Sequence, residues 1–87
     1  MKRNFKDASY IRWRKAVIQR DKYCKYPGCK KRRSLQAHHI IPWSRAALLR
    51  FCVSNGITLC WDCHNKIRGK EHLYVEMFKT ILANDRK

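Results

Sequence analysis

Residues 55–68 read NGITLCWDCHNKIR. The Asn-Gly pair at the start is a turn signal, and the Ile-Thr-Leu that follows at 57–59 predicts a short strand. Residues 60–68 predict a helix that ends at Gly69, because a glycine commonly follows the last residue of a helix. Cys60 and Cys63 lie where the strand passes into the helix, so the first helical turn would bring both sulfurs to one side. The stretch therefore predicts half of a metal site at a strand–helix junction.

A second cysteine pair, Cys24 and Cys29, encloses a Pro-Gly turn far upstream. Zinc takes four ligands in a tetrahedron and binds thiolates well. Two close pairs from distant parts of the chain predict one structural Zn²⁺ on Cys24, Cys29, Cys60 and Cys63. Buried free thiols or disulfides are the alternative, which the spacing and an intracellular setting disfavour. Cys52 is left over, and we expect it to be a small buried apolar residue.

The length of the chain explains the need for such a site. With 87 residues it forms one domain, 1–87, and a core of this size rarely supplies more than ~3–5 kcal/mol. A structural zinc contributes to folding directly. A hydrophobic content of 45% with 11% aromatics is too rich for a disordered basic tail.

Helices are expected on both sides of the cysteine-bearing segments, in an α+β fold. Asp7 or Ser9 would cap the first helix. Ser44 would cap a short helix within the central loop. The expected elements are a helix at 7–21, a strand at 34–41, a short helix at 46–51, a strand at 57–59, a helix at 60–68 and a last helix at about 70–83.

The charge is strongly unbalanced, with 21 Lys and Arg against 6 Asp and Glu, or +15. Most of the excess lies in residues 1–33. It predicts a polyanionic partner, either nucleic acid or an anionic membrane surface. No uncharged stretch is long enough to cross a membrane. No apolar run follows the basic N-terminal residues, so we expect no secretory signal and a cytoplasmic location.

The histidines complete a recognisable pattern. His38 and His39 precede Ile-Ile-Pro, Asn55 stands five residues before the first cysteine of the CxxC pair, and His64 follows the second cysteine. This combination resembles the HNH endonuclease family over about residues 10–68. The resemblance implies a zinc-stabilised, treble-clef-like beta-beta-alpha-metal finger, here with flanking N- and C-terminal helices.

The resemblance also implies a role for each of these side chains. His39 would be the general base, and Asn55 would brace the loop that orients it. His38 and His64 would bind a catalytic divalent metal, and the products would carry 5′-phosphate and 3′-hydroxyl ends. Neighbouring strand residues point to opposite faces, which suits one ligand and one base. Because both must reach one phosphate, we expect a strand end or a local bend at this point.

His38 stands where many family members have Asp. Two imidazoles make a softer site than a carboxylate with an imidazole, which favours Mn²⁺, Ni²⁺, Co²⁺ or Zn²⁺ over Mg²⁺ as the catalytic metal.

Basic side chains near the motif are candidates for contacts with the DNA backbone, although each is also explained as ordinary surface charge. The candidates are Lys30, Lys31, Arg32, Arg33, Arg45, Lys66 and Arg68. His72 matches no motif position and is expected on the surface.

Two functions fit the charge and the zinc site: a metal-dependent DNA endonuclease that nicks or cuts both strands, and a non-catalytic zinc-stapled nucleic-acid-binding module. Only the set of His38, His39, Asn55 and His64 separates them, because a binding module has no need of it. We expect no membrane partner, because a basic membrane-surface protein would leave the zinc site and the histidines unexplained. Small members of the family include phage and bacterial nucleases. We expect low sequence specificity unless a homodimer or a phage or host protein partner supplies it.

Overall fold

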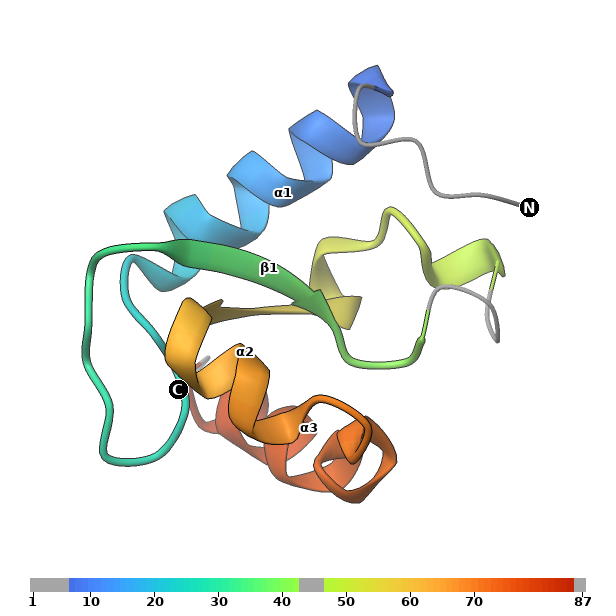
Figure 1. Ribbon diagram of the computed structural model, residues 1–87. Helices are drawn as coiled ribbons and strands as arrows, with labels where there is room; N and C mark the ends of the chain where they lie inside the picture. The colour runs from blue at the N-terminus through green and yellow to red at the C-terminus, as the bar shows by residue number, and fades with distance from the viewer. Residues whose placement is uncertain (1–6, 43–46, 86–87) are drawn as a thin grey trace.

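The computed structural model describes residues 7–42 and 47–85, and it has the expected α+β architecture. Two antiparallel strands form the sheet, β1 (Leu35–His39) and β2 (Gly56–Cys60). Helix α1 (Ala8–Asp21) lies along one side of the strands, and α2 (Trp61–Ile67) and α3 (Val75–Asp85) lie on the other (Figure 1). The strand–loop–strand–helix order of the zinc-stabilised HNH finger is therefore present, with a helix on each flank.

The register of the two strands sets the positions of the motif residues. Leu35 pairs with Cys60 at one end of the sheet, and His39 pairs with Gly56 at the other. The cysteine end and the histidine end of the sheet are therefore distinct. Side chains alternate between the side of α1 and the side of α2 and α3.

Helix α1 begins at an aspartate cap. The Asp7 carboxylate accepts hydrogen bonds from the backbone N–H groups of Ser9 and Tyr10, at 2.8 and 3.3 Å. One face of the helix then buries Trp13, which is 2% exposed, and Val17 against the sheet. Of the two expected caps, Asp7 is the one used.

Gly56 lets α1 approach the sheet closely. A Cβ atom on Gly56 would lie 2.5 Å from Val17 Cγ2 and 2.8 Å from Trp13 Cζ2, both closer than real contacts allow. The sequence marked this glycine only as part of a turn. In the structure it opens β2, and the absence of a side chain there permits the packing of the helix.

An ionic network around the buried Asp21 carboxylate holds the end of α1 to β2. The Asp21 carboxylate accepts a hydrogen bond from the Thr58 N–H at 2.8 Å and pairs with Arg20 at 2.8 Å. Arg20 also donates to the carbonyl oxygens of Val53 and Gly56, at 2.8 and 2.6 Å. No local sequence pattern indicated these contacts, which join residues more than thirty positions apart.

The larger part of the core lies between the sheet and α2 and α3. It contains Ile57, Leu59, Ile67 and Phe78, all fully buried, together with three of the cysteines. None of the helices in the described part of the chain is both long and apolar enough to cross a membrane.

Several element boundaries differ from expectation. The helix expected at 46–51 is only a 3₁₀ turn, Ala47–Leu49, with a second 3₁₀ turn at Val53–Asn55. Its expected cap, Ser44, lies outside the described residues. The last helix begins later than expected, because residues 71–73 form a 3₁₀ turn before α3.

Candidate functional site

The four cysteines expected to bind zinc come together. The Sγ atoms of Cys24, Cys29, Cys60 and Cys63 all lie within 4.8 Å of one another, and those of Cys29 and Cys60 are 3.9 Å apart. Four thiolates at ~2.3 Å from a tetrahedral zinc would be about 3.8 Å apart. No disulfide joins any of the cysteines in residues 7–42 and 47–85. The cluster therefore suits a structural metal such as zinc.

Backbone geometry places both halves of the cluster. The Cys29 N–H donates to the Tyr26 carbonyl at 2.9 Å, and Gly28 takes a φ of 83° to close the turn between them. The Lys25 N–H donates to the Thr58 carbonyl at 2.9 Å, which ties this knuckle to β2. Cys60 ends β2 and caps α2, so Cys63 falls in the first helical turn as expected.

The thiols differ in acidity. Burial raises the pKa of Cys24 and that of Cys63. Burial also raises the pKa of Cys60, but hydrogen bonds from the Cys63 backbone and from the other thiols outweigh it and lower this pKa to about 7. Binding of a metal by all four as thiolates would therefore release protons.

Cys52 is half-buried rather than buried, and its Sγ lies 3.5 Å from the Leu48 carbonyl oxygen. It takes no part in the four-cysteine cluster, as expected.

His38 and His64 face each other on the side of the sheet that carries α2 and α3. Their ring centroids are 5.7 Å apart with planes at 67°, and His38 also meets Phe78 edge-on at 5.7 Å. Metal–nitrogen bonds are ~2.1 Å long, so two rings at this separation are able to offer nitrogens to one ion. Cys63 is buried in the cysteine cluster while its neighbour His64 meets His38, so α2 carries one residue of the cluster and one of the histidine pair.

His39 lies on the other side, against α1. Its ring stacks on Trp13 with centroids 3.9 Å apart and planes at 11°. Its Nε2 lies 2.8 Å from the Arg50 carbonyl oxygen. A carbonyl only accepts, so Nε2 carries the hydrogen, and the neutral ring has its lone pair on Nδ1.

Asn55 joins the two ends of the loop between the strands. Its Oδ1 accepts from the Ile41 N–H at 2.9 Å, and its Nδ2 donates to the carbonyl oxygens of Ile41 and Leu49, at 3.2 and 3.3 Å. Leu49 adjoins Arg50, whose carbonyl holds His39. Asn55 and His39 are therefore both hydrogen-bonded to the same stretch of this loop, at the adjacent residues Leu49 and Arg50.

The opposite orientations of His38 and His39 follow from strand alternation. His39 is the last residue of β1, and the chain bends at Ile40, so the pair stands at the strand end where a bend was expected. Sequence reasoning missed two partners of His39, the Trp13 ring and the Arg50 carbonyl. Trp13 lies within the helix expected at 7–21, and nothing local to that helix indicates a contact with His39.

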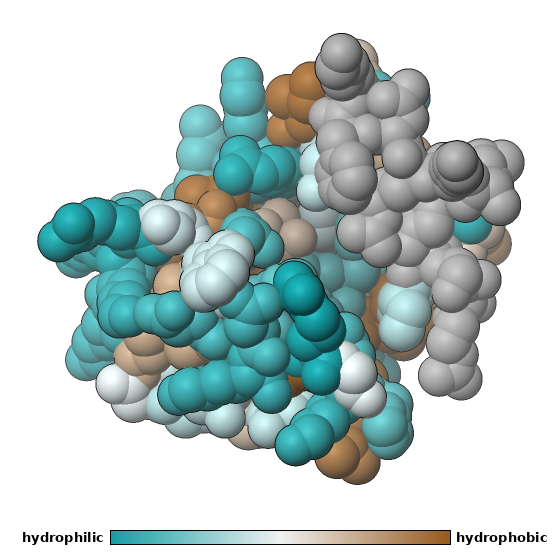
Figure 2. All heavy atoms as spheres, viewed as in Figure 1, coloured by the Kyte–Doolittle hydropathy of each residue, from teal (hydrophilic) through white to brown (hydrophobic). Residues whose placement is uncertain are grey.

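The candidate DNA-contacting residues are distributed over the surface. Most of the face in Figure 2 is hydrophilic. Lys30, Arg32, Arg33 and Arg68 are exposed, whereas Arg45 lies outside the described residues. Lys66 is exposed, with its Nζ 5.5 Å from the centre of the Tyr26 ring.

Lys31 differs from the other candidates because it has an acidic partner. Its Nζ lies 2.6 Å from Asp62 Oδ2. A hydrogen bond to Asp62 and its charge raise the pKa of Lys31, and the same pair lowers the pKa of Asp62. Both side chains are more than half exposed, at 58 and 57%.

A family model described as HNH endonuclease matches residues 22–70, more than half of the chain. The matched segment contains the four clustered cysteines together with His38, His39, Asn55 and His64. No curated protein and no solved structure matches the chain.

Proposed function

The chain belongs to the HNH endonuclease family, and on that premise we propose that it is a metal-dependent endonuclease that hydrolyses phosphodiester bonds of DNA. The family indicates nuclease activity in general; the substrate, the mechanism and the residue roles are our proposal. The observation that supports this proposal most directly is the environment of His39. Its Nε2 is hydrogen-bonded to the Arg50 carbonyl, and its ring is stacked on Trp13.

His39 is the general base of the proposed reaction. Its Nδ1 accepts a proton from water as the water attacks the phosphorus in line with the departing 3′ oxygen. The P–O3′ bond breaks and the departing 3′ oxygen takes a proton from solvent water, which leaves 5′-phosphate and 3′-hydroxyl ends. Such a base typically contributes about 10²–10⁴-fold to the rate. The Trp13 ring and the Arg50 carbonyl fix the plane and the tautomer of the imidazole before the substrate arrives.

His38 and His64 are the proposed ligands of the catalytic metal. Such an ion, when bound, neutralises charge on the phosphoryl group and on the leaving oxygen. Two imidazole nitrogens favour Mn²⁺, Ni²⁺, Co²⁺ or Zn²⁺ over Mg²⁺. The edge of Phe78 against His38 limits the rotation of that ring, because the packing contact would be lost.

The four-cysteine cluster has a separate, structural part in the proposal. It joins the knuckle at residues 24–29 to the start of α2, and α2 carries His64. Zinc in that cluster would therefore hold a catalytic-metal ligand in place without entering the reaction.

The charge supports DNA as the substrate. A chain with a net charge of +15 is strongly attracted to phosphate backbones, and this attraction carries no sequence information. One catalytic site per chain fits both nicking and double-strand cleavage. A monomer would cut one strand, and a homodimer would cut each strand with one of its two sites.

Supercoiled plasmid, incubated with the protein and a panel of divalent metals, tests the proposal. We expect open-circular or linear product with at least one of Mn²⁺, Ni²⁺, Co²⁺, Zn²⁺ or Mg²⁺, and ligation of the nicks by DNA ligase if the ends are as proposed. Tight DNA binding without cleavage under any of these metals would instead identify a zinc-stapled nucleic-acid-binding module.

A further inference from the structure

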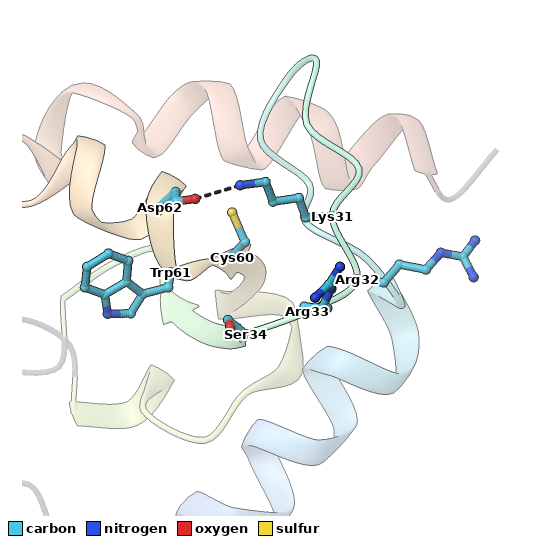
Figure 3. A pocket seen from close by; sticks show the side chains of 7 residues that line it. All are labelled: Lys31, Arg32, Arg33, Ser34, Cys60, Trp61 and Asp62. Atoms are coloured by element: carbon cyan, nitrogen blue, oxygen red, sulfur yellow. Dashed lines mark hydrogen bonds and ion pairs between the residues drawn. The ribbon is translucent and has the colours of Figure 1, made fainter.

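A groove lies at the cysteine end of the sheet, away from the histidines. Its volume is about 550 Å³, and it is lined by the segment from Lys31 to Ser34 and by Cys60, Trp61 and Asp62 (Figure 3). Leu35 pairs with Cys60 beside the groove, whereas His38 pairs with Ile57 three positions further along the strands. At ~3.4 Å per residue, the groove and the histidine end are about 10 Å apart.

Trp61 is the unusual residue of this groove. It is 56% exposed at the start of α2, while Trp13 is 2% exposed in the core. The exposed indole offers a large, flat apolar surface on which another ring is able to stack. Trp61 and Arg33 lie on opposite sides of Ser34 and Cys60 in Figure 3.

The charges around the groove select an anionic occupant. Lys31, Arg32 and Arg33 are exposed, and Asp62 is the one acidic residue among those lining the groove. The Asp62 carboxylate is paired with Lys31 at 2.6 Å, so it offsets one of the three cations. The Arg32 side chain extends away from the other six (Figure 3), which leaves Lys31 and Arg33 as the cations nearest to an occupant.

We propose that this groove binds an unpaired nucleotide of a DNA strand, with its base stacked on Trp61 and its phosphates beside Lys31 and Arg33. An aromatic face beside cations is the common means of holding single strands without reading their sequence. A base in the interior of a duplex is covered on both faces by its neighbours, so away from duplex ends an unpaired base is needed for stacking on the indole.

This inference rests on the proposed nuclease function and makes its substrate class narrower. Stacked nucleotides rise ~3.4 Å each along a strand, so 10 Å corresponds to about three nucleotides. The preferred substrate is then DNA with a single-stranded segment about three nucleotides from the bond that is cut, such as a flap, a gap or an overhang.

Binding of short labelled DNA to three proteins tests the inference: the parent, Trp61→Phe and Trp61→Leu. Fluorescence anisotropy, without added divalent metal, would compare a thymidine oligonucleotide with a blunt duplex of equal length. We expect Trp61→Leu to weaken single-strand binding about 5- to 150-fold, the range for loss of one stacked base. Duplex binding should stay unchanged, and Trp61→Phe should keep most of the single-strand affinity.

A third variant, Asp62→Asn, tests the cationic part of the groove. It releases Lys31 from its partner, so single-strand binding should become tighter, most clearly at low salt. Zinc content and urea unfolding, measured on every variant, establish that each protein is folded. A uridine oligonucleotide bound more tightly than the thymidine one would overturn the assignment to DNA.

An equal loss of single-strand and duplex binding in Trp61→Leu, or no loss at all, would overturn the inference. These outcomes are separate from the plasmid test. If the parent cleaves plasmid and Trp61→Leu binds both DNAs normally, the nuclease proposal stands and the groove proposal is refuted. If the parent never cleaves but Trp61→Leu binds single strands more weakly, the groove proposal stands and the nuclease proposal is refuted.

Discussion

Trp13 and His39 form a parallel stack across the interface between α1 and β1, with ring centroids 3.9 Å apart and planes at 11°. The indole is fixed in turn, because Trp13 Nε1 donates to the Cys52 carbonyl oxygen at 2.8 Å. Gly56, the register partner of His39, leaves the space into which Trp13 fits. The position of the proposed base thus depends on the docking of a helix from outside the finger.

Gly56→Ala should disturb this stack. The new Cβ would meet Trp13 and Val17 at 2.8 and 2.5 Å, and these buried side chains have little room to move. We expect a loss of about 1–3 kcal/mol in the free energy of unfolding, as for other overpacked cores, and a reduced cleavage rate. Urea unfolding and plasmid cleavage measure the two effects. Ser54→Ala, at an exposed neighbouring position, is the control and should change neither.

His39→Ala should abolish cleavage and keep DNA binding and zinc. The expected loss is about 10²–10⁴-fold, because the proton acceptor is gone. His39→Gln is the matched variant, since its amide is able to donate to the Arg50 carbonyl but is not a base; it should be equally inactive. Full activity in either folded variant would refute His39 as the base.

His38→Ala and His64→Ala should lose cleavage for a different reason, weaker binding of the catalytic metal. Excess Mn²⁺ or Ni²⁺ should therefore restore part of their activity and none of that of His39→Ala. Calorimetric metal titration of the zinc-loaded proteins checks the cause. If metal affinity is unchanged in both variants, the assignment of these two ligands is wrong.

Asn55→Ala should reduce cleavage about tenfold, less than the loss of a general base. The side chain is hydrogen-bonded to Ile41 and Leu49, in the loop that also carries the Arg50 carbonyl, so we expect its effect to be one of positioning. A split in the kinetics distinguishes this role from general destabilisation: kcat should fall with KM unchanged once rates are corrected for the folded fraction. An equal change in DNA binding would contradict it.

Cys24→Ser should yield unfolded or insoluble protein, whereas Cys52→Ser should fold. The reason is that Cys24 lies in the four-thiol cluster and Cys52 does not. Removal of zinc from the parent by a strong chelator should unfold it in the same way, because the metal contributes to folding. Metal analysis and circular dichroism follow both experiments. A well-folded parent that holds no metal would end the zinc assignment.

DNA affinity should fall steeply with salt. If six to ten phosphates are neutralised, log affinity plotted against log salt should have a slope of roughly −5 to −9. Replacement of Lys30, Lys31, Arg32 and Arg33 by Ala should flatten that slope and leave urea unfolding unchanged, since all four side chains are exposed. A slope near zero for the parent would exclude backbone charge as the main source of affinity.

The amino-acid sequence determined the parts of this protein whose chemistry is local. The spacing of Cys60 and Cys63, the step from strand to helix between them, and the alternation of His38 and His39 each depend on a few consecutive residues. The pairing of the two distant cysteine pairs was also predictable, because zinc demands four ligands and few other arrangements supply them. These features are present in the structure as expected.

The loop between the strands was decided by tertiary contacts instead. A helix was expected at 46–51, but side chains take up the backbone carbonyl oxygens there. Asn55 donates to Leu49 and His39 donates to Arg50. Trp13 donates to the nearby Cys52 carbonyl. The backbone there forms hydrogen bonds of the 3₁₀ type between residues three positions apart, such as Arg50 N–H to Ala47 O at 3.3 Å. Those donors come from β1, from α1 and from the far end of the loop, so propensity within the loop carries no sign of them.

The docking of α1 and the groove beside Trp61 belong to the same class. From the sequence alone, Gly56 is interpreted as a turn residue and Asp21 as the last residue of a basic helix. Trp61 has no assigned role and is one of the two residues between Cys60 and Cys63. Only the folded chain places Gly56 against Trp13, Asp21 against the Thr58 N–H, and the exposed Trp61 at a groove that Lys31 and Arg33 also line. Each of these contacts joins segments far apart in the chain, and it is the packing of a helix on a sheet, rather than any local pattern, that selects which residues meet.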